Sequence, residues 1–136
     1  MAGVDGDPAA VVGAVYERFG RGDLDGIVAL LAPDAVWHLP GPAGIPNAGT
    51  WRGPAGVRDW FAAFGAAVAI EAFAVDRMLA AGDTVVALGR ERARAKATGK
   101  VFETSFAHVW TVAGGRIAGF TDTLDTAAVA AAFVRP

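Results

Sequence analysis

The chain has 136 residues, of which 54% are hydrophobic and 19% are charged. This length and composition predict one compact domain over residues 1–136 and argue against a disordered chain. Twelve basic and fourteen acidic residues give a net charge of −2, without the basic excess of a nucleic-acid-binding surface, and the absence of cysteine excludes disulfides and thiolate chemistry.

The sequence also lacks the features of a membrane protein. Its longest apolar run, residues 61–70, is about half as long as a segment that crosses a bilayer. The first five residues are acidic rather than basic and apolar. We therefore expect a cytoplasmic protein that has neither a membrane nor a nucleic acid as a partner.

Helical signals dominate the first half of the chain. Asp7 and Pro8 predict the start of a first helix, because aspartate caps free backbone N–H groups and proline fits the first helical position. Asp23 caps a second helix, which is expected to continue until Pro33. Residues 35–39 then form a strand that ends at a proline.

A long loop and a third helix lead into the second half, where strands predominate. The loop over residues 41–54 is rich in glycine and proline, and a long structured loop in a small domain is more often functional than not. The third helix is expected at residues 54–67. The remaining predicted elements are strands at 69–79, 84–97, 101–112 and 116–124 and a closing helix at 127–133. Helices followed by antiparallel strands indicate the α+β class.

Several short motifs occur in the order and spacing of one known family. They are Gly22-Asp23-Leu24-Asp25-Gly26, Asp34-Ala35-Val36-Trp37, Trp51-Arg52-Gly53, His108-Val109-Trp110, Gly114-Gly115-Arg116-Ile117 and Leu124-Asp125-Thr126. The chain resembles the SnoaL-like and ketosteroid-isomerase-like branch of the nuclear-transport-factor-two-like superfamily. This resemblance implies a cone-shaped, curved antiparallel sheet wrapped around three to four helices, and we expect a homodimer formed through the exposed sheet face. It leaves the reaction open, because this fold carries many activities.

The catalytic positions of the steroid isomerases are vacant in this chain. The resemblance places the base position at Leu39, the tyrosine position at Val15 beside Tyr16, and the aspartate donor at Ala107. None of these residues can play the corresponding role, so steroid isomerisation by that machinery is not predicted.

Two other branches of the family offer candidate catalytic residues. The Asp–Arg–Asp set of limonene-epoxide-hydrolase-like members matches Asp122 and Arg90, but its second aspartate falls on Arg92. SnoaL-type cyclases place an aspartate where the last strand meets the closing segment, which corresponds to Asp125. The predicted catalytic residues are therefore Asp122, Asp125 and Arg90.

Each candidate also has a purely structural interpretation. Asp122 shares a strand face with Phe120 and Leu124, where apolar surroundings would raise its pKa toward the range useful for proton transfer, or it pairs with a structural arginine such as Arg90. Asp125 is equally well placed to cap the closing helix. Arg90 would either stabilise developing negative charge or form a salt bridge.

An aromatic pocket is expected to hold the substrate. The predicted lining residues are Tyr16, Trp37, Leu39, Trp51, Trp60, Phe64, Ala107 and Phe120. Trp51, in the loop, is the candidate lid contact, and Tyr16 either donates a hydrogen bond into the cavity or packs at its rim.

Three further polar residues are predicted to lie outside the pocket. Strand alternation from the vacant base position at Leu39 turns His38 outward, and the placement of Ala107 in the pocket does the same for His108. Glu91 is expected on a solvated face.

The sequence thus predicts a small enzyme that acts on a lipophilic, oxygenated molecule of polyketide or terpenoid type. The expected reaction is an acid–base cyclisation, isomerisation or dehydration that uses neither a metal nor an organic cofactor. Two alternatives stay open, namely a non-catalytic module for small-molecule binding or dimerisation, and an epoxide hydrolase of the limonene-epoxide-hydrolase type.

Overall fold

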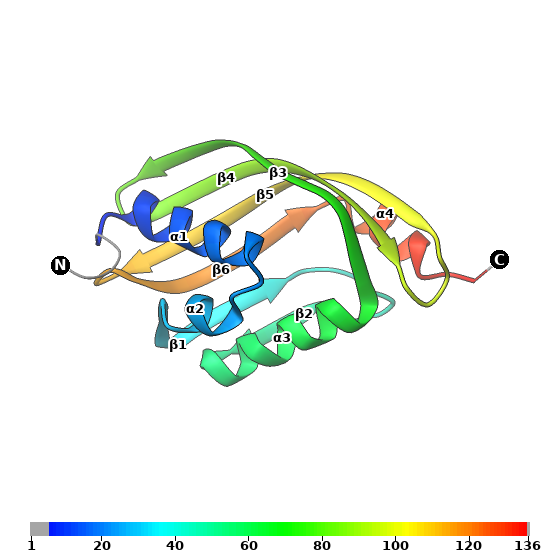
Figure 1. Ribbon diagram of the computed structural model, residues 1–136, viewed down its shortest axis with the longest axis horizontal. Coiled ribbons are helices and arrows are strands. Elements are labelled where there is room, and N and C mark those ends of the chain that lie inside the picture. The colour runs from blue at the N-terminus through cyan, green and yellow to red at the C-terminus, as the bar shows by residue number, and fades with distance from the viewer. Residues whose placement is uncertain (1–5, 136) are drawn as a thin grey trace.

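The computed structural model describes residues 6–135, in which a six-stranded sheet curves around helices (Figure 1). The acidic start at residues 1–5 lies outside this range. The elements in chain order are α1 (Pro8–Gly20), α2 (Leu24–Val28), β1 (Leu31–Leu39), β2 (Gly49–Arg52), α3 (Gly53–Ala67), β3 (Val68–Ala81), β4 (Thr84–Ala95), β5 (Val101–Ala113), β6 (Arg116–Leu124) and α4 (Thr126–Ala132).

The strand order is β2-β1-β6-β5-β4-β3. Strands β3 to β6 pair antiparallel with their sequence neighbours, as turns between consecutive strands require. Strand β1 joins β6 in parallel, so the sheet is mixed rather than wholly antiparallel. The predicted α+β class is confirmed. Figure 1 shows α1 across the long strands, α3 along β1 and β2, and α4 near the C-terminus.

Aspartate caps begin three of the four helices described. The side chains of Asp7, Asp23 and Asp125 each accept a hydrogen bond from the backbone N–H three residues later, at 3.1, 2.9 and 3.0 Å. Each bond satisfies a backbone donor that the first helical turn leaves free. These three caps were all predicted from the sequence.

The second helix ends earlier than predicted. It stops at Val28, and β1 already begins at Leu31, so Pro33 lies within a strand instead of ending a helix. The Ile117 N–H donates to the Leu30 carbonyl, which ties this segment to β6. Pro33 has no N–H to give to the ladder, and the pairing of β1 with β6 is shifted between Leu31 and Val36.

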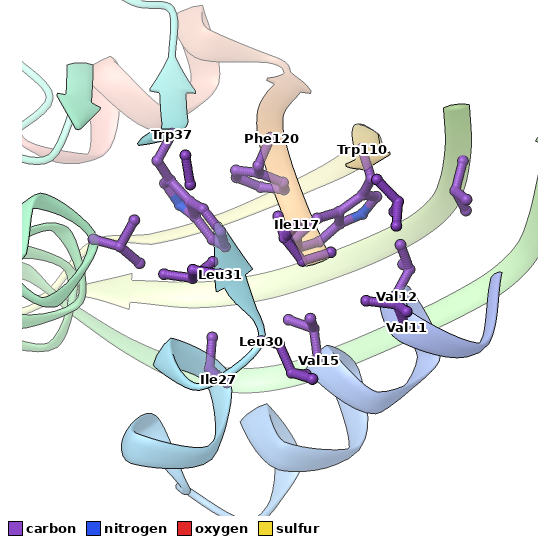
Figure 2. Close-up of a cluster of buried hydrophobic side chains, with 14 of the residues drawn as sticks. Val11, Val12, Val15, Ile27, Leu30, Leu31, Trp37, Trp110, Ile117 and Phe120 are labelled. Atoms are coloured by element: carbon purple, nitrogen blue, oxygen red, sulfur yellow. The ribbon is translucent and has the colours of Figure 1, made fainter. Parts of the chain in front are cut away.

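Buried apolar side chains from both halves of the chain meet between α1 and the sheet. Figure 2 shows Val11, Val12 and Val15 of α1 directed toward Trp110 and Ile117, with Phe120 beside Trp37. A second cluster lies nearer α4 and includes Leu39, Ile45, Val68, Phe102 and Val129. No helix among residues 6–135 is both long enough and apolar enough to cross a membrane.

Gly89 permits a close approach of three strands. It pairs with Phe106 of β5, and a Cβ atom at position 89 would overlap the ring of Phe106 and the carbonyl oxygen of Ala74 on β3. The Phe106 ring in turn stacks on His108 with 3.9 Å between ring centroids. The absence of a side chain at Gly89 therefore helps to place His108.

Gly89→Ala is expected to lower the free energy of unfolding by about 1 to 3 kcal/mol, because a backbone atom must move to admit the methyl group. The matched control is Gly13→Ala in α1, where the added Cβ meets nothing within 4 Å. That variant should be more stable than the wild type by about 1 kcal/mol, since alanine is the better helix former. Urea denaturation measures both, and equal effects at the two positions would contradict the close-approach argument.

Candidate functional site

A cavity lies between the helices and the inner face of the sheet. It encloses about 740 Å³ of space, part of which is open to solvent. Most of its wall is apolar or aromatic, from Val15, Phe19, Trp37, Leu39, Ile45, Trp60, Phe61, Phe64, Val68, Phe73, Phe102, Trp110, Phe120, Leu124 and Val129. The other lining residues are Tyr16, Asn47, Glu91, His108 and Asp122. A mainly apolar cavity with a few convergent polar groups is typical of a small-molecule site.

A chain of polar contacts crosses this cavity wall. The Trp110 indole N–H donates to the Tyr16 hydroxyl at 3.0 Å, and that hydroxyl lies 2.6 Å from Nδ1 of His108. Nε2 of His108 lies 3.2 Å from Oδ1 of Asp122, its cross-strand partner on β6. These polar contacts thus link α1, β5 and β6 within apolar surroundings.

The direction of the hydrogen bonds follows from the chemistry of each group. Burial raises the pKa of Tyr16 well above its ordinary value, with a smaller opposing effect from the Trp110 hydrogen bond, so the phenol keeps its proton. When the His108 ring carries a single proton, we assign that proton to Nε2, because that nitrogen faces a carboxylate. Nδ1 is then an acceptor, and Tyr16 donates to it.

Asp122 lines the cavity on the strand face that it shares with Phe120 and Leu124. Its Oδ1 is buried and has no hydrogen-bond partner, since the contact with His108 does not meet hydrogen-bond geometry. The parallel register of β1 and β6 pairs Trp37 with Phe120. Continued by two residues, this register sets Leu39 beside Asp122, so the vacant base position and the aspartate are neighbours.

His108 points into the cavity, and the prediction that it faces outward is wrong. Its side chain is 7% exposed and lines the cavity. The prediction that Ala107 lines the cavity is also wrong, because Ala107 belongs to the opposite face of β5. The buried residues of β5 are Phe102, Thr104, Phe106, His108, Trp110 and Val112. This alternation was visible in the sequence. The resemblance placed a pocket position at Ala107, one residue from His108, and a shift of one residue exchanges the two faces of a strand.

Glu91 also points inward, contrary to the prediction of a solvated face. The inner face of β4 carries Val85, Ala87, Gly89, Glu91, Ala93 and Ala95, and its outer face carries Arg90, Arg92 and Arg94. Burial, followed by the negative charge of Asp122, raises the pKa of Glu91 to about 7. The three alternating arginines were the signal that placed Glu91 inside.

Arg90 lies outside the cavity. Its guanidinium donates two hydrogen bonds to the carboxylate of Asp76, at 2.9 and 3.0 Å, and both side chains are exposed on the outer face of the sheet. Arg90 therefore neither pairs with Asp122 nor reaches a molecule in this cavity. The Asp–Arg–Asp arrangement of the epoxide hydrolases is not assembled there.

Two more predicted site residues lie outside the cavity lining. Asp125 caps α4, and its backbone N–H donates to the Thr104 hydroxyl at 2.9 Å. Trp51 is half-buried on β2, and its indole N–H donates to the Asn47 carbonyl at 3.2 Å. Trp51 thus holds the backbone of the loop at Asn47 and is not a lid contact.

Trp37, Leu39, Trp60, Phe64 and Phe120 line the cavity, as predicted for the pocket wall. His38 faces outward, as predicted, where Nδ1 lies 2.9 Å from the Thr50 hydroxyl.

The sequence reasoning missed Asn47. It lies in the glycine- and proline-rich loop and is 4% exposed, and its side-chain amide has no hydrogen-bond partner within residues 6–135. The prediction that this loop is functional pointed to its neighbourhood, but Trp51 and not Asn47 was predicted to contact the ligand. No cluster of three or more His, Cys, Asp or Glu side chains suited to a metal ion occurs in the described part of the chain.

The comparisons with known proteins assign the family. The chain belongs to the SnoaL-like domain family, whose model matches residues 12–120. An NTF2-like protein from Burkholderia thailandensis E264 is 36% identical, with a TM-score of 0.84, over 93% of this chain and 97% of that one. An NTF2-like protein from Burkholderia xenovorans LB400 is 28% identical, with a TM-score of 0.86, over 98% and 100%. The predicted family and cone-shaped fold are confirmed.

A third solved structure carries a ligand name. It is TerC co-crystallised with polyporic acid, which is 26% identical to this chain with a TM-score of 0.82, over 93% of this chain and 97% of TerC. No curated protein matches the chain.

The raised pKa of Glu91 predicts a pH-dependent stability. Between the ordinary value of 4.5 and about 7, the folded state binds more protons at Glu91 than the unfolded state does. The free energy of unfolding should therefore fall as the pH rises through this window, by about 1 to 3 kcal/mol, because one pKa unit is about 1.4 kcal/mol and solvent screens a partly exposed group.

Urea denaturation across this window, for the wild type and for Glu91→Gln, isolates the effect. The variant should lack this part of the pH dependence and be the more stable protein above the pKa. Parallel pH profiles for the two proteins would show that Glu91 titrates normally.

Proposed function

We propose that this protein is an acid–base catalyst that acts on a lipophilic, oxygenated small molecule held in the aromatic cavity. The observation that carries the proposal is the position of Asp122, a carboxylate with an unpaired oxygen inside an apolar site, beside a histidine whose other ring nitrogen contacts a buried tyrosine. A positioned carboxylate of this kind is suited to take up a proton from carbon or oxygen.

In the proposed mechanism Asp122 accepts a proton from the bound molecule and returns it at another atom of the same molecule. The Nε2–H of His108, 3.2 Å from Oδ1, stabilises the carboxylate before transfer. Tyr16 acts as a positioning residue, because its hydrogen bond to Nδ1 fixes the ring. Since the proton is returned, the cycle is balanced and fits an isomerisation, a cyclisation or a dehydration that releases water.

One protein of the same fold supports an organic small molecule as the ligand. TerC, which shares the fold and 26% of its residues, was co-crystallised with an organic acid, polyporic acid. The wall of this cavity is built from the same kind of apolar surface that an organic ligand buries. The epoxide-hydrolase alternative loses its arginine to the outer face of the sheet, and the binding-only alternative is an outcome of the experiment below.

The predicted homodimer and cytoplasmic location remain proposals. Dimerisation through the outer face of the sheet would involve the arginine-rich face of β4, and sedimentation of the purified protein at several concentrations measures it. A monomer at every concentration would refute the dimer without affecting the catalytic proposal.

Asp122→Asn should abolish proton transfer while leaving the fold intact. A suitable probe is β-tetralone, an apolar bicyclic ketone whose acidic C–H groups exchange with D2O and can be followed by NMR. The wild type should accelerate exchange above the buffer rate, and the variant should lose about 100-fold or more of that acceleration, because the amide is not a base.

The matched control is Asp125→Asn, which keeps a good helix cap and lies outside the cavity. It should exchange the probe at the wild-type rate. A wild type no faster than buffer would favour the binding-only function, and full activity in Asp122→Asn would exclude Asp122 as the base.

A further inference from the structure

We infer that the ligand of this cavity is a lipophilic cation, a protonated amine carried on an apolar ring body. The inference rests on the proposed function only in taking this cavity as the ligand site, and it does not require catalysis. Three properties of the cavity support it, namely its acidic side chains, its unused hydrogen-bonding groups and its aromatic faces.

The cavity lining holds acidic side chains without a lysine or an arginine to balance them. Of the described residues that line it, Glu91 and Asp122 are acidic, and none is a lysine or an arginine. The arginines that flank Glu91 in the sequence point to the outer face, where Arg90 pairs with Asp76 and Arg92 pairs with Glu71 and Glu103. Charge in a water-poor site acts more strongly than at the surface, so an anionic ligand would be repelled and a cationic one attracted.

The unused polar groups are mainly acceptors. Neither a hydrogen bond nor an ion pair holds the Glu91 carboxyl within the described chain, and Oδ1 of Asp122 and the Asn47 amide also lack hydrogen-bond partners. A buried acceptor without a donor is costly, and an ammonium group supplies three donors.

Several of the donors at the cavity wall are committed or covered. The Tyr16 hydroxyl donates to His108, and the Trp110 indole N–H donates to Tyr16. The indole N–H groups of Trp37 and Trp60 have no partner, but both nitrogens are buried out of reach. The donors that remain among the lining side chains described are the Asn47 amide, the Nε2–H of His108 that faces Asp122, and the Glu91 carboxyl when it is protonated. This inventory suits a ligand that brings donors.

The aromatic wall adds a third attraction. Rings from α1, β1, α3, β3, β5 and β6 face the cavity, and aromatic faces attract ammonium groups while packing against an apolar body. Their members are Tyr16, Phe19, Trp37, Trp60, Phe61, Phe64, Phe73, Phe102, Trp110 and Phe120.

A cationic ligand also resolves a difficulty of the proposed reaction. Removal of a proton from carbon ordinarily leaves a negative charge, which a site must hold with free donors. This cavity has few. When the ammonium group of the ligand lies beside the reacting carbon, its positive charge and N–H donors offset the negative charge that loss of the proton to Asp122 leaves, so the ligand supplies what the protein lacks.

Three probes of the same shape and different charge test the inference. They are β-naphthylmethylamine, which is a cation near neutral pH, β-naphthylmethanol, which is neutral, and β-naphthoate, which is an anion. Isothermal titration of the full chain should give the amine roughly tenfold higher affinity than the alcohol, with the naphthoate weakest.

Variants then locate the preference. Glu91→Gln and Asp122→Asn should each reduce the affinity for the amine and leave that for the alcohol nearly unchanged. Asp76→Asn, which removes an exposed carboxylate on the outer face, is the matched control and should bind all three probes as the wild type does. Titrations in buffers of different ionisation enthalpy should show proton release on amine binding in the wild type and its loss in Glu91→Gln.

Groups on several strands surround Glu91 and are relevant to that proton count. They are Phe73 of β3 and Thr104 of β5, the cross-strand partners of Glu91, and Asp122 of β6, whose charge raises the pKa of Glu91.

Equal affinities for the three probes, tighter binding of naphthoate, or no binding of any probe would overturn the inference. The exchange of neutral β-tetralone would still test the proposed function separately.

Discussion

The alternation of side chains along three paired strands is the constraint on which the rest of this structure depends. Strands β4, β5 and β6 each turn one face toward the helices, and their antiparallel register pairs Ala87 with His108 and His108 with Asp122. The same constraint that buries the aromatic residues of β5 and β6 therefore also buries a histidine and an aspartate. It directs Glu91 inward and the arginines on either side of it outward.

The polar groups of the cavity differ in how far the protein satisfies them. The Trp110 indole N–H donates to the Tyr16 hydroxyl, which also contacts His108. These contacts stiffen one side of the site. Asp122 and Glu91 lie at the other extreme, because an oxygen of one and the carboxyl of the other have no hydrogen-bond partner. A fold keeps such costly groups where a ligand can satisfy them.

The fold allows a carboxylate to line this cavity from more than one strand. The position that holds the base in steroid isomerases is Leu39, at the end of β1, and Asp122 lies beside it on the adjacent strand of the same sheet. A carboxylate can therefore reach nearly the same part of the cavity from either strand. A comparison restricted to equivalent positions therefore finds Leu39 and overlooks the carboxylate on the adjacent strand.

The sequence by itself determined the class of fold, the family, the aspartate caps and most of the aromatic wall, because these depend on local spacing and on residue type. Only the tertiary structure decided which charged residues share the cavity. A displacement of one residue turns every side chain of a strand to the opposite face, so His108 and Ala107 were exchanged. Arg90 satisfied the sequence pattern, but the partner that holds it, Asp76, becomes its neighbour only when the chain folds.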